Sequence, residues 1–142
     1  MTARLFFLGA AAVMGLAAIA NGMFMLGAPQ SWYLTVPGVT MTGPFNQHFV
    51  RDLGLIYLLA GASFLAGVRN SGFRLVLWAV PTIWLSGHAL FHVWEVAVGI
   101  SGHSAMARDF PAVTLPAIVG SALAFWAMKT REATPEADAL KV

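Results

Sequence analysis

The stretch LVLWAVPTIWLSGHALFHVWEVAVGI, residues 75–100, decides the fold, because it is apolar along almost its whole length. It contains a single acid, Glu95, and no Lys or Arg. A helix needs about 20 predominantly apolar residues to cross the hydrocarbon core of a bilayer. Backbone groups in lipid have no water to bond, so a spanning segment satisfies them internally as an α-helix. Residues 75–100 therefore predict a transmembrane helix.

Three further segments have a similar length and composition, at about residues 5–26, 49–68 and 110–128. Hydrophobic residues make up 58% of the 142-residue chain and charged residues 10%, and the mean hydropathy is +0.74. A water-soluble domain with so little charge could not cover its own surface. The sequence predicts an all-α protein, a four-transmembrane-helix bundle that lies in a lipid bilayer. We expect one transmembrane domain over residues 1–128 and a polar, disordered tail over residues 129–142.

The first of these segments begins MTARLFFLGAAAVMGLAAIA, residues 1–20, which has the basic start and apolar centre of a secretory signal peptide. The apolar run continues through NGMFML, residues 21–26, to a spanning length. We therefore expect this segment to be retained as the first transmembrane helix.

Basic residues are distributed unequally between the loops. Six lie at the termini and in the link between the second and third segments, whereas two lie on the opposite side. The positive-inside rule then predicts that both termini are cytoplasmic and that residues 28–47 and 101–109 face outward. We expect a multi-pass protein of the bacterial inner (cytoplasmic) membrane, with these loops on the periplasmic side. The six are Arg4, Arg69, Arg74, Lys129, Arg131 and Lys141, and the two are Arg51 and Arg108.

A stripe of ionisable residues interrupts the third segment. At 100° per residue, His88, His92 and Glu95 fall within about 60° on one helix face. A charged group at membrane depth costs roughly 2.5 to 3.5 kcal/mol, so this stripe should face the interior of the bundle. His48, Arg51 and Asp52 also share a face, at the outer end of the second segment. Apposing the two faces predicts a His/carboxylate pocket near the outer (periplasmic) face.

A transition metal, Zn, Fe or Cu, is the first candidate ligand of this pocket. His88 and His92 are four residues apart and can chelate one ion, and Glu95, His48 and Asp52 can complete its shell. Imidazole together with carboxylate suits zinc or iron, and a metal with an open position can activate water.

If the pocket is catalytic, the chemistry is metal-assisted, with Glu95 or Asp52 as the base and Tyr57 as a candidate proton donor. Arg51 would orient a carboxylate or an anionic ligand. Asn21, in the outer half of the first helix, is a further candidate cofactor contact.

Two other interpretations of the same residues remain open. A b-type haem would need axial histidines on facing helices, such as His48 and His92. Alternatively the cluster is a structural network, with Arg51 paired to Asp52 or Glu95, in a non-enzymatic accessory subunit. A variant of this network surrounds a small molecule, a lipid headgroup or a quinone.

Small residues at Ala11, Gly15, Ala18 and Gly22 form a stripe that predicts close helix packing, within the bundle or between protomers. A homo-oligomer or a larger membrane complex is therefore a candidate assembly. The chain has no Cys, which excludes disulfides and thiolate sites, and its formal charge of +2 is scattered, which gives no support to a nucleic-acid partner.

Prolines and serines inside the spans carry expectations of their own. Pro81 and Pro116 are interior prolines and predict kinks. Ser63 lacks the neighbours of a catalytic nucleophile, and we expect it to bond back to its own helix.

The segments WYLTVPGV (32–39), TGPFNQHFVRDLGLIYL (42–58) and HALFHVWE (88–95) resemble a pattern in a family of small four-helix integral membrane proteins of bacteria. The resemblance implies the same four-helix fold. It implies no activity and no site residue.

Overall fold

The computed structural model describes residues 2–132, and every regular element in this range is helical. Four elements are long: α1 (Thr2–Gly27), α3 (Gln47–Arg69), α4 (Arg74–Ala97) and α6 (Leu115–Glu132). Four are short: α2 (Pro29–Thr35), η1 (Val39–Met41), α5 (Ser104–Asp109) and the π-helical segment η2 (Phe110–Thr114). Together α5, η2 and α6 form one apolar stretch, Ser104–Arg131, so the described chain has four helical stretches long and apolar enough to span a membrane. The predicted all-α fold with four candidate spans is confirmed.

The fourth span begins earlier than the sequence indicated. Helix α5 starts at Ser104 rather than near residue 110, so Arg108 and Asp109 belong to the helical stretch instead of a loop. The stretch also continues beyond residue 128, because α6 ends at Glu132. The tail predicted over residues 129–142 is therefore helical at its start, and residues 133–142 lie outside the described part of the chain.

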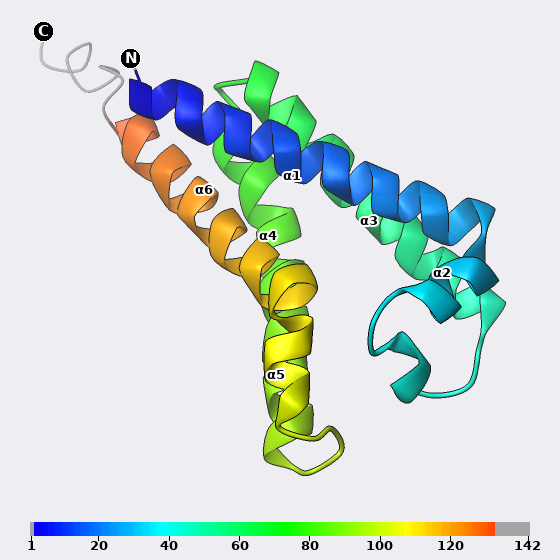
Figure 1. The fold of residues 1–142 in the computed structure, drawn as a ribbon. Coiled ribbons are helices and arrows are strands. Elements are labelled where there is room, and N and C mark those ends of the chain that lie inside the picture. Colours follow the sequence, from blue (N-terminus) through cyan, green and yellow to red (C-terminus); the bar gives the residue numbers. More distant parts are fainter. Residues whose placement is uncertain (1, 133–142) are drawn as a thin grey trace, which may run out of the picture.

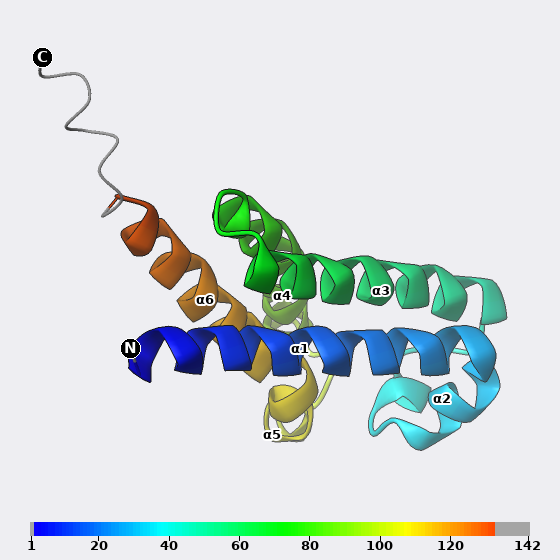
Figure 2. The same ribbon diagram turned by 90° about the horizontal axis from the view of Figure 1, so that it is seen from above.

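The long helices form two pairs. Helix α1 lies along α3, and α4 lies along the stretch α5–η2–α6 (Figures 1 and 2). The pairs meet where the start of α1, the α3–α4 turn and the end of α6 come together, which we call the basic end. They diverge toward the opposite end, the loop end, which carries α2, η1 and residues 98–109 (Figure 1). The result is a bundle that opens between α3 and α4 at its loop end.

Glycines hold α1 against α3 at backbone distance. A Cβ atom added at Gly61 would lie 2.6 Å from the carbonyl oxygen of Gly15, and one at Gly22 would lie 2.7 Å from that of Gly54. Ala11, Gly15 and Gly22 are buried in this contact. The predicted close packing of the small-residue stripe is confirmed within the chain. Assembly into an oligomer stays a prediction, and these residues no longer argue for it.

The core of the molecule lies between α3, α4 and α6. Trp78, Phe64 and Leu123 are fully buried there. The indole Nε1 of Trp78 donates a hydrogen bond of 3.0 Å to the carbonyl oxygen of Phe64. This bond satisfies the polar atom of an otherwise apolar side chain and fixes α4 on α3.

Pro81 leaves one backbone carbonyl of α4 without its helical hydrogen bond, and Ser63 of the neighbouring helix α3 supplies the missing donor. Pro81 has no N–H, so the carbonyl oxygen of Leu77 lacks its usual bond from four residues on. The hydroxyl of Ser63 on α3 donates to this oxygen at 2.5 Å. The expectation that Ser63 bonds to its own helix was wrong, because α4 presents an acceptor that α3 lacks.

Helix α4 continues through Pro81, whereas the fourth span changes direction between α5 and α6, where the π-helical segment precedes Pro116 (Figure 1).

Replacing Ser63 with alanine should lower the free energy of unfolding by about 1 to 3 kcal/mol, since the Leu77 carbonyl would be left without a partner away from water. Thermal unfolding in detergent measures the effect. Ser121→Ala is the matched control, because the Ser121 hydroxyl bonds the Ala117 carbonyl of its own helix. The cost of Ser63→Ala should shrink in a Pro81→Ala background, where residue 81 regains its N–H. An equal cost in both backgrounds would contradict this account of Ser63.

Candidate functional site

A continuous line of aromatic and ionisable side chains runs along α4 toward the loop end. Trp84, His88 and His92 follow one another at steps of four residues, which places them on one helix face. The rings of Trp84 and His88 are stacked with centroids 5.3 Å apart, and those of His88 and His92 meet edge to face at 4.7 Å. From α3, Tyr57 contacts Trp84 edge to face at 5.4 Å. The adjacency of His88 and His92 predicted from their spacing is confirmed.

The fourth span completes this line at the loop end. His92 Nδ1 lies 3.0 Å from Asp109 Oδ2, and Asp109 also accepts two bonds from Arg108, 2.6 Å from Nε and 3.0 Å from Nη2. The side chains of His92 and Asp109 are 22% and 11% exposed. A two-point guanidinium–carboxylate pair is among the stronger polar contacts in proteins. We call the set Tyr57, Trp84, His88, His92, Asp109 and Arg108 the polar line.

Arg108 also joins the two helix pairs across the loop end. Its Nη1 lies 3.1 Å from the sulfur of Met41, and its guanidinium covers Gly38, where an added Cβ would overlap it. Gly38 has φ +87°, a left-handed conformation that favours glycine. A cavity of about 120 Å³ lies beside this contact, lined by Met41, Thr42, Ile100, Ser101, Gly102, Ser104, Ala105 and Arg108. The polar line therefore ends at a cavity of the loop end.

Three members of the polar line, Tyr57, Trp84 and His88, have no side-chain hydrogen bond to a described residue. The hydroxyl of Tyr57 and the ring nitrogens of His88 make ring contacts only, and both side chains are half-buried. Tyr57 lies near the middle of α3, and His88 lies past the middle of α4, so both sit within the candidate spans. Polar groups at such depth normally find a partner in a neighbouring helix. Tyr57, Trp84 and His88 are thus the members of the line that can bind a ligand without breaking an existing hydrogen bond.

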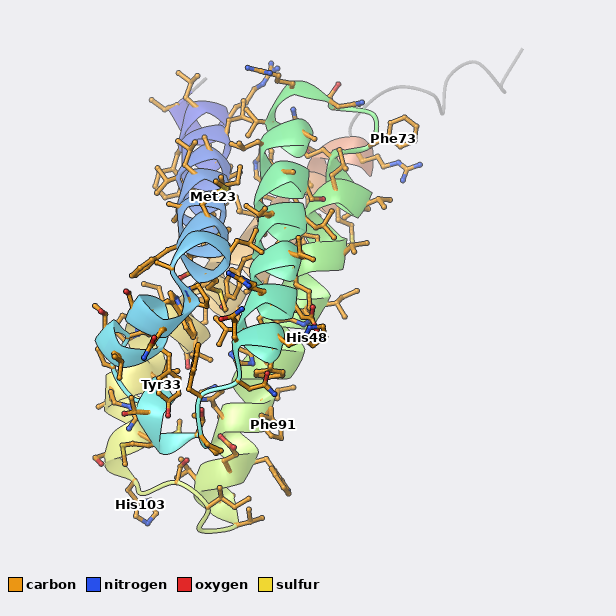
Figure 3. The ribbon with its side chains drawn as sticks, turned by 90° about the vertical axis from the view of Figure 1, so that its right-hand side faces the viewer. Met23, Tyr33, His48, Phe73, Phe91 and His103 are labelled. Atoms are coloured by element: carbon orange, nitrogen blue, oxygen red, sulfur yellow. The ribbon has the colours of Figure 1, made fainter. Side chains whose placement is uncertain are left out.

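The residues predicted to hold a metal do not gather in one place. His48 pairs with Asp52 along the same turn of α3 at 3.2 Å, with side chains 89% and 55% exposed, and Figure 3 shows His48 at the surface of that helix. Glu95 is half-exposed and makes no side-chain bond to a described residue. Within residues 2–132 no three His, Asp or Glu side chains lie close enough to hold one ion. The expected meeting of the two faces is corrected: His92 meets Asp109 instead of His48 or Asp52, because α3 and α4 diverge at the loop end.

The haem hypothesis required His48 and His92 to face each other, and each is paired with a different carboxylate instead. Metal and haem binding stay predictions.

Two predicted cofactor contacts hold the chain together in this structure. Arg51 Nε donates to the carbonyl oxygen of Leu26 at 3.2 Å, near the end of α1. Asn21 Oδ1 accepts a bond of 2.9 Å from Trp32 Nε1, which ties α2 back onto α1. Arg51 thereby supplies a donor to the last turn of α1, where carbonyls lack helical partners. A role of either residue toward a ligand stays a prediction.

Sequence reasoning missed three members of the polar line: Trp84, Arg108 and Asp109. Trp84 was one aromatic among many, and only its spacing of four residues from His88 marked it. Arg108 and Asp109 were placed in or beside a loop, although an adjacent acid and base on the same side as the histidines was a usable signal. Because the fourth span begins at Ser104, Arg108 and Asp109 are helical, and Asp109 contacts His92 on α4.

Comparison of the chain with protein families, with curated proteins and with solved structures finds no match. This result is consistent with a resemblance to a family that carries no assigned function, and the function must be argued from the chain's own geometry.

Proposed function

We propose that this chain is a multi-pass inner-membrane protein, with both termini cytoplasmic, that binds a lipid-soluble molecule with a polar ring at the polar line. The class best suited is a quinone. The observation that carries the proposal is that two groups without a hydrogen bond, the Tyr57 hydroxyl and the His88 imidazole, belong to rings that both contact Trp84. Both side chains are half-buried and lie within the candidate membrane spans, so a ligand that reaches them would come from the bilayer.

The chemistry of these side chains matches a quinone ring. Its two carbonyl oxygens accept hydrogen bonds, which a phenol hydroxyl and a ring N–H both donate. The surrounding surface is aromatic and apolar, as in most small-molecule sites, where a few polar groups fix the orientation of the ligand. The isoprenoid tail of such a ligand would remain in the lipid between the diverging helices.

The rest of the polar line gives the bound ring a route to the loop end. His88 contacts His92, and His92 bonds Asp109 beside the loop-end cavity. Imidazoles change protonation near neutral pH and serve as proton carriers in membrane proteins. These side chains can therefore carry a proton between His88 and the loop end.

The proposal predicts that decylubiquinone quenches the tryptophan fluorescence of the protein in nanodiscs in a saturable way. Tyr57→Phe and His88→Leu should each weaken the apparent Kd by roughly tenfold, the equivalent of about 1.4 kcal/mol for one lost hydrogen bond. Tyr33→Phe and His103→Leu are matched controls. The Tyr33 hydroxyl already bonds the Gly43 carbonyl, His103 is an exposed loop-end residue, and Figure 3 shows both. Unsaturable quenching, or equal affinity in all four variants, would contradict the proposal.

A transition metal is the second candidate for the same side chains. The observation that favours it is the carboxylate on His92 Nδ1, because this contact orients the ring and leaves Nε2 free, as the outer-shell partner of a ligating histidine does. His88 lies beside it. Elemental analysis and a visible spectrum of the purified protein separate the candidates. Stoichiometric metal that is lost in His92→Ala supports a metal centre, and a Soret band supports haem.

A further inference from the structure

Arg74 is a buried cation at the basic end. It is 8% exposed, and its guanidinium lies over two aromatic rings, with the carbon 5.6 Å from the ring centroids of both Trp78 and Trp126. Its Nε donates to the carbonyl oxygen of Gly67 at 2.9 Å, and its Nη2 donates to that of Val68 at 3.3 Å. These bonds satisfy carbonyls in the last turn of α3. Every one of these partners is uncharged.

No carboxylate among the described side chains balances this charge. Asp52, Glu95 and Asp109 lie on the first turns of α3, the end of α4 and the end of α5, all toward the loop end. A buried charge carries a large desolvation penalty that an opposite charge normally offsets. Arg74 Nη1 makes no hydrogen bond to a described residue, so one side of the guanidinium remains available for an anion.

The charged residues in the helices at this end are basic apart from Glu132, the last residue of α6. Arg4 lies in the first turn of α1, is exposed and forms no ion pair with a described residue. The start of α1, the α3–α4 turn and the end of α6 lie together here, as Figure 1 shows, so the basic end also carries Arg69, Lys129 and Arg131. Arg4 and Arg74, in the first turns of α1 and α4, therefore lie at the same end of the bundle, where one anion can meet both.

We propose that Arg74 and Arg4 together bind the phosphate of an anionic phospholipid in the cytoplasmic leaflet. Guanidinium groups bind phosphate oxygens through charge-assisted hydrogen bonds. Anionic headgroups lie at the depth of the helix ends, and basic pockets between transmembrane helices on the cytoplasmic side bind such lipids. A zwitterionic lipid suits this end less well, because its headgroup cation would face Arg4. The proposal does not depend on the quinone site, which lies toward the other end of the bundle.

The test is thermal unfolding of the full chain in an uncharged detergent, with phosphatidylglycerol, phosphatidylcholine or inorganic phosphate added. Phosphatidylglycerol should raise Tm by several degrees, because a ligand that binds the folded state stabilises it, whereas the other two should leave Tm unchanged. Arg4→Gln should lose about half of this rise or more, since one of the two cations that bind the phosphate is gone. Arg51→Gln, which removes the same charge at the loop end, should keep it. Arg74→Gln should abolish the rise, and the exposed Arg4 tests the proposal even if Arg74→Gln fails to fold.

Four outcomes would overturn the proposal. An equal response to phosphatidylcholine would show that any bilayer lipid suffices, and an equal response to inorganic phosphate would show a free-anion site. If wild type gives no response and Glu136→Gln/Asp138→Asn gains one, the chain's own acidic tail is the partner of Arg74. An unchanged lipid response in Arg4→Gln would likewise remove Arg4 from the site.

Discussion

Replacing Gly61 with valine should prevent α1 from packing on α3 and destabilise the fold by about 3 kcal/mol or more, at the upper end of the range for overpacking. A Cβ at position 61 would lie 2.6 Å from the carbonyl oxygen of Gly15, 2.7 Å from Ile19 Cγ1 and 2.9 Å from the Ile19 amide nitrogen. Two of these atoms are backbone, so no rotamer change makes room and the whole of α1 would have to move. The expected result is a large fall in Tm and aggregation on size-exclusion chromatography.

Gly9 on α1 supplies the matched control for this prediction. Nothing lies within 4 Å of a Cβ atom added there, and the residue faces outward. Gly9→Val therefore changes the same residue type to the same β-branched side chain without a clash. Wild-type thermal stability in Gly61→Val, or an equal loss in both variants, would disprove the close glycine contact.

Replacing Asp109 with asparagine should cost about 2 to 3 kcal/mol, the range for a hydrogen bond to a charged group. The change keeps the shape of the side chain and removes its charge. Arg108 and His92 would both lose their carboxylate partner. The Arg108 side chain is only 27% exposed, so water would replace that partner incompletely. Because Arg108 also reaches Met41 and Gly38, the loss should loosen the contact of the α1–α3 pair with the α4–α6 pair at the loop end. A fall in Tm and faster amide hydrogen exchange around residues 38–41 are the measurements.

Asp52→Asn is the control for this second prediction. Asp52 also pairs with a histidine, at 3.2 Å, but both side chains are largely exposed. Exposed ion pairs contribute little to stability, so its Tm should stay close to that of wild type. The two variants make the same chemical change at histidine pairs of similar length, but Asp109 is buried and also accepts two bonds from Arg108. Equal effects would mean that the Asp109 network contributes no more than an ordinary surface pair.

Several parts of the candidate site could be predicted from local spacing. The spacing of His88 and His92 places them on one face of α4, and their rings are in contact. The small-residue stripe that includes Gly15 and Gly22 predicted a close helix contact, which α3 provides. These features depend on the helical repeat and on glycine, which has no side chain to keep two helices apart, and both can be read from the sequence.

Partnerships between helices were not predictable in the same way. Ser63 bonds the Leu77 carbonyl because Pro81, on another helix, leaves that acceptor free, and a sequence does not state which helix faces which. His48 was expected to meet the histidines of α4 but pairs with Asp52 on its own helix. The angle between α3 and α4 decides this outcome, and no local pattern records that angle.

The sequence by itself determined that residues 2–132 contain four apolar helical stretches of spanning length, because hydropathy and backbone hydrogen bonding leave a lipid-exposed segment no other structure. It also determined which face of α4 carries the imidazoles. Only the tertiary structure decided which carboxylate those imidazoles meet, since Asp109, Asp52 and Glu95 were all within reach on composition alone. The physical reason is that helix formation depends on each segment's own residues, whereas the crossing and divergence of helices depend on packing contacts from all four at once.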